Sequence, residues 1–183
     1  MHTYSLIIEL PLPVKNQIAN LCFGPSQILW IEKQNIYFLL YSFGDLSDLE
    51  LSELKENLEK LFFHSFVFNM RGIKSTKFKG KGIIGIESVN HPALEKINKD
   101  LEKLLKKFSL RKKETSPFPL VLGYYEKIDF ERLIDYLMAY STFESLPIEV
   151  KELTLIHVKP SSKGSIYEEI AYYPASKFEF GED

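Results

Sequence analysis

The stretch that decides the fold is residues 34–44, which read QNIYFLLYSFG. Its centre is almost continuously hydrophobic and predicts a strand over Ile36–Phe43, which Gly44 ends. A run of this kind is typical of a strand that is buried on both faces. A second strand of the same character is expected at Leu120–Tyr125. Such strands need cover on both sides, which indicates sheets with helices packed outside them.

Other strands and helices are expected around these two strands. Apolar and β-branched stretches predict further strands at Tyr4–Leu10, Ile28–Ile31, Phe66–Asn69, Gly82–Ser88, Val150–Val158 and Ile166–Tyr173. Apolar side chains at helical spacing predict helices that start near Pro11, Ser47, Pro92 and Asp129. Ser47 and Glu50 have the spacing of a capping box, which supports the second of these helices.

The order of the predicted elements repeats, because strand, helix, strand, helix, strand occurs in each half of the chain. The repeat predicts an internal duplication, with halves of roughly 1–80 and 81–183 in a single bilobal domain spanning 1–183. Two lobes related by approximate two-fold symmetry would place the two hydrophobic strands opposite each other. The predicted fold class is therefore α+β, two-lobed and pseudo-symmetric, with two facing antiparallel sheets and helices outside.

The composition fits one globular domain. The chain has 183 residues and a mass of 21.3 kDa, with 45% hydrophobic and 26% charged residues. Its longest apolar run, Ile36–Tyr41, is far below the ~20 residues that span a bilayer. Without a signal peptide pattern, a cytoplasmic location and no membrane contact are expected. The single cysteine, Cys22, excludes an internal disulfide. The sequence predicts no metal site and no cofactor, and it leaves the oligomeric state open.

Basic residues concentrate in one region of the chain. Residues 71–113 contain 13 Lys and Arg against 4 Asp and Glu, a net charge of +9, whereas the whole chain carries −2. Lys77, Lys79 and Lys81 lie there in a glycine-containing stretch without acidic residues. Such a stretch could hold the phosphates of RNA or of a nucleotide. The alternative is a solvated, mobile loop followed by an ordinary charged helix face.

Two segments resemble the motif regions of a known family. Trp30, the stretch 34–39 and the closing Phe43-Gly44 are similar to the first motif region of the 2′-5′ RNA ligase family. This family is also called the RNA 2′,3′-cyclic phosphodiesterases and belongs to the two-histidine phosphoesterase superfamily. Residues 117–122, PFPLVL, resemble its second motif region with one residue deleted. The layout of most of the chain is similar too, so the resemblance implies the two-lobed fold of that superfamily.

The catalytic motifs of that family are missing. In the family, two H-x-[ST] motifs supply a general base and a general acid, because an imidazole exchanges protons near neutral pH. The corresponding positions here are Tyr37, Leu39, Leu120 and Leu122. Leucine has no proton to transfer, and tyrosine, with an unperturbed pKa of about 10, is a poor base at neutral pH. No histidine occurs in residues 3–63 or 92–156, so no register shift restores either motif. We therefore expect no catalytic residue.

The histidines and the cysteine have structural explanations. His64 is expected to interact with a helix C-terminus, and His91 to cap the helix that starts at Pro92. His157 is expected to be a half-buried strand residue. Cys22 has no nearby basic residue to lower its pKa, so we expect an inert thiol.

Tyrosines and lysines are the candidate binding residues. Tyr37 and Tyr41 lie four positions apart in one predicted strand, so the period of two places them on the same face. Aromatic side chains on such a face stack nucleobases, although sheets also favour aromatic residues for packing alone. Together with Lys77, Lys79 and Lys81, these two tyrosines make up the predicted binding set.

Three functions follow from these observations. The first, which we expect, is a catalytically inactive relative of the family, a pseudoenzyme that binds RNA, a nucleotide or another small ligand. The second is an active RNA 2′,3′-cyclic phosphodiesterase that uses non-standard residues. The third is a structural or interaction protein whose cleft is filled by Leu39, Leu120 and Leu122.

Overall fold

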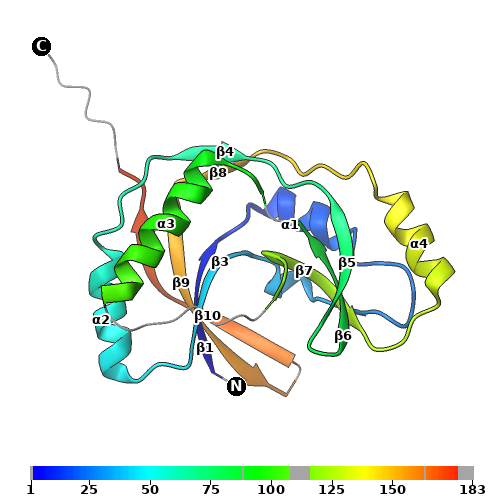
Figure 1. Ribbon diagram of the computed structural model, residues 1–183, viewed down its shortest axis with the longest axis horizontal. Helices are drawn as coiled ribbons and strands as arrows, with labels where there is room; N and C mark the ends of the chain where they lie inside the picture. The colour runs from blue at the N-terminus through cyan, green and yellow to red at the C-terminus, as the bar shows by residue number, and fades with distance from the viewer. Residues whose placement is uncertain (1, 88, 108–115, 163, 177–183) are drawn as a thin grey trace, which may run out of the picture.

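Two four-stranded antiparallel sheets make up the centre of the molecule (Figure 1). The computed structural model describes residues 2–87, 89–107, 116–162 and 164–176. The first sheet has the order β10-β9-β1-β3, with β1 Thr3–Ile8, β3 Phe38–Gly44, β9 Glu152–Ser161 and β10 Gly164–Pro174. The second has the order β2-β7-β6-β5, with β2 Leu29–Trp30, β5 Ile73–Phe78, β6 Lys81–Ile86 and β7 Leu120–Tyr125. A small third sheet pairs β4 Phe66–Phe68 with β8 Ile148–Val150.

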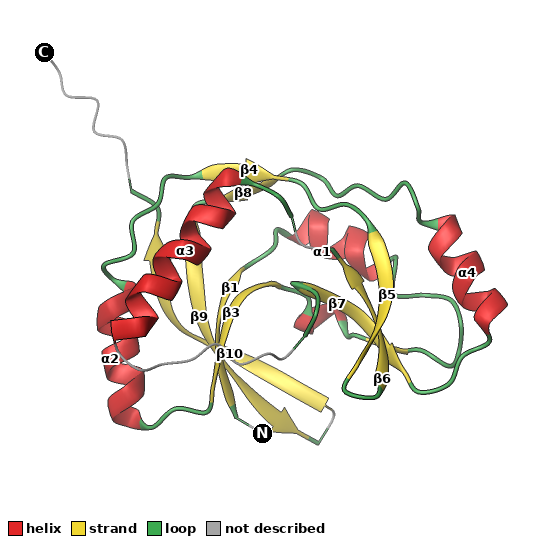
Figure 2. Cartoon of the chain, in the orientation of Figure 1, coloured by secondary structure: helices red, strands yellow, loops and turns green. Residues whose placement is uncertain are grey.

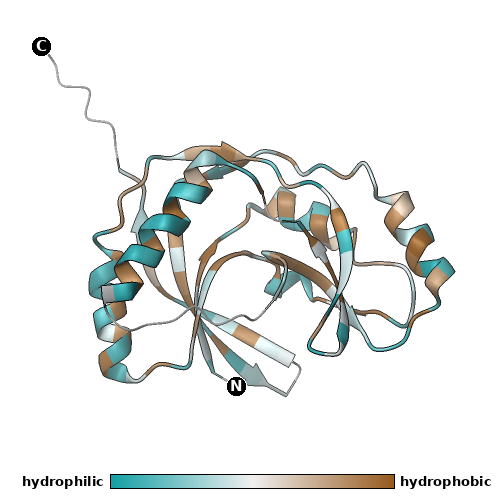
Figure 3. Ribbon diagram, viewed as in Figure 1, coloured by the Kyte–Doolittle hydropathy of each residue, from teal (hydrophilic) through white to brown (hydrophobic). Residues whose placement is uncertain are grey.

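The helices lie outside the two sheets (Figure 2). They are α1 Leu12–Ala19, α2 Asp48–Leu58, α3 Pro92–Lys107 and α4 Phe130–Ala139, with a short 3-10 helix, η1, at Lys33–Asn35. Helices α2 and α3 lie beside the first sheet, and α1 and α4 beside the second. The strands between the helices are largely hydrophobic, whereas α2 and α3 are mostly hydrophilic (Figure 3). The α+β class with antiparallel sheets and outer helices is therefore confirmed.

The helix starts follow from their capping residues. The Ser47 hydroxyl accepts from the N–H of Glu50, and the Glu50 carboxylate accepts from the N–H of Ser47, which completes the capping box at α2. The Asp129 carboxylate accepts from the N–H of Glu131 at the start of α4. At α3, the ring Nδ1 of His91 accepts from the N–H of Ala93, so the expected capping role of His91 is confirmed.

Each sheet takes strands from both halves of the chain. The first sheet joins β1 and β3 with β9 and β10, and the second joins β2 and β5 with β7. The two sheets therefore do not coincide with the halves 1–80 and 81–183. The internal duplication itself stays a prediction.

The basic stretch before β6 is a strand, and the alternative of a mobile loop is wrong there. Strands β5 and β6 form a hairpin whose turn has positive φ at Lys79 and Gly80. Ile73 and Ser75 pair with Ile86 and Ile84 on the partner strand. The pairing with an apolar partner makes β5 a strand, although its own lysines and hydroxyls hide the period-two pattern.

A β-bulge in β3 decides which side chains face the second sheet. Leu6 pairs with Tyr41 and Ile7 with Leu39, so Leu40 is the extra residue. A bulge of this kind shifts the alternation of side chains by one position. Tyr41 therefore shares the face of Leu6, which belongs to the main hydrophobic core. Leu39 shares the opposite face with Ile7.

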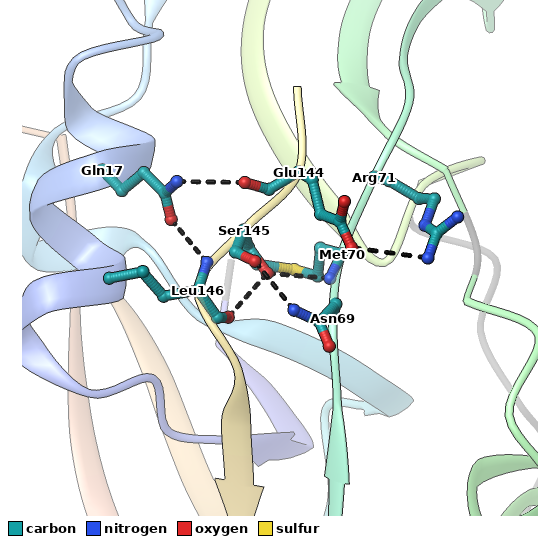
Figure 4. A network of polar contacts seen from close by, with 7 residues as sticks. All are labelled: Gln17, Asn69, Met70, Arg71, Glu144, Ser145 and Leu146. Atoms are coloured by element: carbon teal, nitrogen blue, oxygen red, sulfur yellow. Dashed lines mark hydrogen bonds and ion pairs between the residues drawn. The ribbon is translucent and has the colours of Figure 1, made fainter. Parts of the chain in front are cut away.

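The segment that leads from β4 to β5 and the segment that leads from α4 to β8 run side by side (Figure 4). Residues 69–71 pair antiparallel with residues 144–146. The N–H of Ser145 donates to the carbonyl of Met70 at 2.7 Å, and the N–H of Met70 donates to the hydroxyl of Ser145 at 2.8 Å. Ser145 is 4% exposed, so both bonds are shielded from water.

Gln17 of α1 ties this pair of segments to the first helix (Figure 4). Its amide nitrogen donates to the carbonyl of Glu144 at 3.1 Å, and its amide oxygen accepts from the N–H of Leu146 at 2.9 Å. An ion pair between Arg71 and Glu144 lies next to these bonds, with 3.4 Å between the charged atoms. The network therefore connects α1 to the two segments that precede β5 and β8.

We predict that Ser145→Ala destabilises the protein. The substitution leaves the buried N–H of Met70 without its acceptor, which typically costs about 1–3 kcal/mol. Urea unfolding measured by circular dichroism checks this. The matched control is Ser141→Ala, at an exposed position after α4, which should stay within about 0.5 kcal/mol of the parent. Equal stabilities of the two variants would contradict the role assigned to the network.

Candidate functional site

A cavity of about 390 Å³ opens between the two sheets. Its walls come from β2, η1, the entry to β3, strand β7 and the β9–β10 hairpin. The lining residues are Leu29, Trp30, Ile31, Glu32, Asn35, Tyr37, Tyr124, Val158, Gly164, Ser165 and Tyr167. We call this cavity the inter-sheet pocket. It lies in the range of about 300–1,000 Å³ that is usual for sites that bind small molecules.

Local pairing places the pocket's side chains. Leu29 of β2 pairs with Tyr124 of β7, so these two side chains lie next to each other on the same face of the sheet. The short helix η1 turns the chain so that Asn35 meets the β9–β10 hairpin. There the amide of Asn35 donates to the carbonyl of Ser165 at 3.0 Å. This bond links the segment before β3 to the hairpin and holds one wall of the pocket.

Tyr37 lies between two other tyrosines of the pocket. Its ring stands edge-on to the ring of Tyr167, with 5.4 Å between the centroids. Burial, with smaller contributions from Tyr124 and Tyr167, raises the pKa of Tyr37 to about 12. Tyr37 is therefore a neutral phenol at pH 7 and offers an aromatic surface and an O–H group.

An ion pair that the sequence did not reveal lies next to this pocket. Lys15 of α1 pairs with Glu9, and Lys15 also donates to the hydroxyl of Tyr167 at 3.4 Å. The Tyr167 hydroxyl donates to the Glu9 carboxylate at 3.2 Å. Burial alone would lower the pKa of Lys15, but the Glu9 carboxylate outweighs it and the pKa is raised. These three residues are far apart in the chain and form no motif, so only the fold brings them together.

The predicted pairing of Tyr37 with Tyr41 on one face is wrong. Tyr37 lines the inter-sheet pocket. Tyr41 is 5% exposed and packs in the main core, where its ring lies 5.1 Å from that of Phe43. The reason is the bulge at Leu40, which reverses the alternation between the two tyrosines.

Leu120 and Leu122, two of the leucines that the third hypothesis places in the cleft, do not line the inter-sheet pocket. Both are buried in the main hydrophobic core. Val121, between them, pairs with Gly85, and the ring of Phe118 occupies the space beside Gly85 where a Cβ would lie. A bulge at Leu122 then lets Tyr124, rather than its predecessor, line the pocket.

The three predicted lysines lie around the β5–β6 hairpin but on different faces. Ile83 pairs with Tyr124, so these two side chains share one face of the second sheet. Lys81 lies two residues before Ile83 and shares that face. Lys77 pairs with Gly82 and lies on the opposite face, while Lys79 occupies the turn. The fold therefore brings Lys81, but not Lys77, to the side of the pocket.

Parts of the basic region 71–113 are neutralised by neighbouring carboxylates. Lys74 pairs with Glu87 across the β5–β6 hairpin, and Lys96 pairs with Asp100 one turn along α3. Residues 108–113 of this region lie outside the described residues. Binding of RNA or of a nucleotide by the region stays a prediction.

All four histidines lie away from the inter-sheet pocket. His2 and His157 contact each other, with 3.1 Å between Nδ1 of His2 and Nε2 of His157. His157 is half-buried, as predicted, and strand alternation directs it away from its neighbour Val158, which lines the pocket. His64 forms an isolated bridge with Ser176, beyond the end of α2.

Cys22 fits the prediction of an inert thiol. Burial raises the pKa of Cys22 to about 11, so the thiolate is scarce at neutral pH. Its sulfur lies 3.7 Å from the carbonyl oxygen of Leu122. The side chain therefore belongs to the packing between α1 and β7.

A second cavity, of about 530 Å³, lies between β4 and the start of α3. It is lined by His91 and by the charged side chains of Arg71 and Glu87. Arg71 is paired with Glu144 and Glu87 with Lys74, so these charges already have partners. The inter-sheet pocket is the better candidate site because it joins both sheets and contains Tyr37.

Two further features bear on the class of protein. Across residues 2–87, 89–107, 116–162 and 164–176, no three His, Cys, Asp or Glu side chains are grouped so that they could hold a metal ion. Within the same residues, every helix is too short or too polar to cross a membrane.

Comparisons with known proteins identify the fold. No protein-family model matches the chain, and no curated protein matches it. Among solved structures, LigT of E. coli in its apo form superposes with a TM-score of 0.71 at 13% identity, over 96% of this chain and 98% of LigT. The protein TT0787 of Thermus thermophilus gives a TM-score of 0.73 at 12% identity, over 94% and 97% of the two chains. A structure described as a phosphoesterase gives 0.70 at 13% identity, over 97% and 100%. The chain therefore has the fold of LigT, a 2′-5′ RNA ligase, and of related phosphoesterases, as the sequence resemblance predicted.

We predict that His157 makes the protein less stable at acid pH. Burial, then Lys159 and His2, lowers the pKa of His157 below its usual value of 6.5. The unfolded chain therefore binds this proton more readily, and stability declines as the pH falls through 6.5. Urea unfolding from pH 8.5 to 5.5 should show a shallower acid decline in His157→Gln than in the parent. Identical declines would contradict the assignment, and equal slopes between pH 7.5 and 8.5 serve as the internal control.

Proposed function

We propose that the chain is a catalytically inactive protein with the LigT fold that binds a nucleotide, free or at an RNA end, in the inter-sheet pocket. The observation that carries the proposal is the set of aromatic side chains in this pocket, Tyr37, Tyr124 and Tyr167. Aromatic rings stack on every base because each base has a π face. LigT of E. coli has been crystallised with 3′-AMP and with ATP, which makes nucleotides the ligands to test first.

Lys81 gives this proposal a place for the phosphate. It lies on the same face of the second sheet as Tyr124, just beyond the pocket. A nucleotide whose base is stacked in the pocket could extend its phosphate along this face toward the ammonium group. Lys77 carries the same charge but lies on the opposite face of the second sheet, so it is a matched control for Lys81.

The residues near the pocket support the proposed loss of the family's acid–base mechanism. General acid–base catalysis by positioned groups contributes about 10²–10⁴-fold to a rate. Tyr37, with a pKa of about 12, keeps its proton at neutral pH. The four histidines of the chain lie elsewhere, so neither proton-transfer group of the family is replaced by another imidazole.

We predict that Tyr124→Ala weakens binding of AMP about tenfold, because stacking of a base on an aromatic ring is worth ~1–3 kcal/mol. Calorimetric titration of the parent and the variant measures this. Tyr172→Ala, which removes a tyrosine exposed on β10 and outside the pocket, should bind AMP like the parent. Equal affinities of all three proteins would overturn the placement of the base.

We also predict that Lys81→Glu weakens AMP binding several-fold more than Lys77→Glu does. A cation that contacts phosphate also adds to the salt dependence of binding. Titrations at two salt concentrations should therefore show a smaller salt effect in Lys81→Glu than in Lys77→Glu. If both variants lose affinity equally, the phosphate lies elsewhere on the hairpin.

The protein should not open a 2′,3′-cyclic nucleotide or a 2′,3′-cyclic phosphate at an RNA end. Incubation of purified protein with both substrates, followed by chromatography of the products, checks this. Turnover that disappears in Tyr37→Phe would contradict the inactive assignment and would make Tyr37 a catalytic residue. Turnover that survives in Tyr37→Phe would also contradict the inactive assignment, and it would place an active site elsewhere in the chain.

A further inference from the structure

The inter-sheet pocket gathers tyrosine rings from three separate segments of the chain. Tyr37 comes from the entry to β3, Tyr124 from β7 and Tyr167 from β10. Trp30 of β2 pairs with Gly123, and its ring packs against Tyr136 of α4, with 5.2 Å between the centroids. The rings of Tyr37 and Tyr167 stand nearly perpendicular, at 79°, so they present surfaces in two directions. Rings that border a cavity from several directions form a cage rather than a single stacking platform.

The charges in this pocket favour a cation. The faces of aromatic rings carry negative potential, which attracts a cation within about 6 Å of the ring centre. Tyr37 is a neutral phenol at pH 7, so it contributes the potential of its ring face and no formal charge. The one charged side chain among the described lining residues is Glu32, whose carboxylate also accepts a hydrogen bond from the amide of Gln34. Glu32 is exposed, so it lies where the pocket opens to solvent.

A neutral purine gains less than a cationic one from a pocket that has both aromatic rings and a carboxylate. Adenine and guanine are neutral, so they gain stacking from the rings but no attraction to a carboxylate beyond hydrogen bonds. Methylation of guanine at N7 gives the ring system a formal positive charge and leaves it planar. Its N1–H and amino group are donors that a carboxylate accepts. A cationic, N-methylated guanine therefore matches the rings and the carboxylate at once.

We propose that the inter-sheet pocket selects a nucleotide with a cationic, N7-methylated guanine over the unmethylated nucleotide. The inference rests on the proposed function, because it names the base that the nucleotide pocket prefers. The rings supply cation–π contacts, which are strongest where the cation is shielded from water. Glu32 supplies the complementary charge and the acceptor for the base's N–H groups.

The test compares 7-methylguanosine 5′-monophosphate with guanosine 5′-monophosphate on the full chain, by calorimetric titration. We expect the methylated nucleotide to bind roughly fivefold to thirtyfold tighter, the range that one or two cation–π contacts give. Glu32→Gln keeps the shape of the side chain and removes its charge, so it should reduce this preference to near unity. Glu131→Gln, at an exposed position on α4 outside the pocket, should keep the preference.

The outcomes separate this inference from the function on which it rests. Equal affinities of the parent for the two nucleotides overturn the inference and leave nucleotide binding standing. A preference that survives in Glu32→Gln overturns the role of the carboxylate and with it the assignment of the cation to this pocket. If neither nucleotide binds to a protein that circular dichroism shows to be folded, the proposed function fails as well.

Discussion

A backbone hydrogen bond between the two sheets governs the geometry of the centre of this molecule. Strand β3 is the edge of the first sheet, and an edge strand has N–H groups that need partners. The N–H of Leu39 donates to the carbonyl of Pro119, immediately before β7, at 2.8 Å. This bond joins the two sheets where β3 meets the start of β7. Tyr37, two residues before Leu39, and Tyr124, later in β7, are thereby brought to the same pocket.

The bulges in the two strands determine what the junction exposes. In β3 the extra residue Leu40 directs Tyr41 into the core and leaves Tyr37 toward the pocket. In β7 the bulge at Leu122 shifts the alternation, so that Leu120 and Leu122 lie in the core and Tyr124 lines the pocket. At the position that corresponds to the family's first motif histidine, the pocket therefore holds the ring of Tyr37. That replacement is the basis of the proposed change from catalysis to binding.

The fold could be predicted from the sequence because it depends on local patterns. The continuous hydrophobicity of residues 34–44 predicts β3, and that of Leu120–Tyr125 predicts β7. The capping box at Ser47 predicts the start of α2. Strand β5 was missed because its pairing with β6 makes it a strand, whereas its own side chains are mostly polar. The relation between the sheets and the chain halves could not be predicted either, since it depends on long-range pairing.

The site could be predicted only in part. Tyr37 was found because its strand resembles a motif region, but Tyr41 was assigned to the wrong face because a bulge leaves no sequence signal that we could identify. Trp30 was noted as part of the resemblance, and the structure places it in β2 with its ring against Tyr136 of α4. The group of Glu9, Lys15 and Tyr167 depends on contacts between α1 and the C-terminal hairpin. The spacing of these residues in the sequence does not predict such a contact.

The most direct test of the account is a map of where a nucleotide binds. Amide chemical shifts of ¹⁵N-labelled protein, followed during addition of AMP, report the residues whose surroundings change. The account predicts that the largest changes fall on Asn35, Tyr37, Tyr124 and Ser165, around the inter-sheet pocket. Changes centred instead on Asn69, Asn90 and His91, around the cavity at the start of α3, would contradict it. So would a spectrum that AMP leaves unchanged.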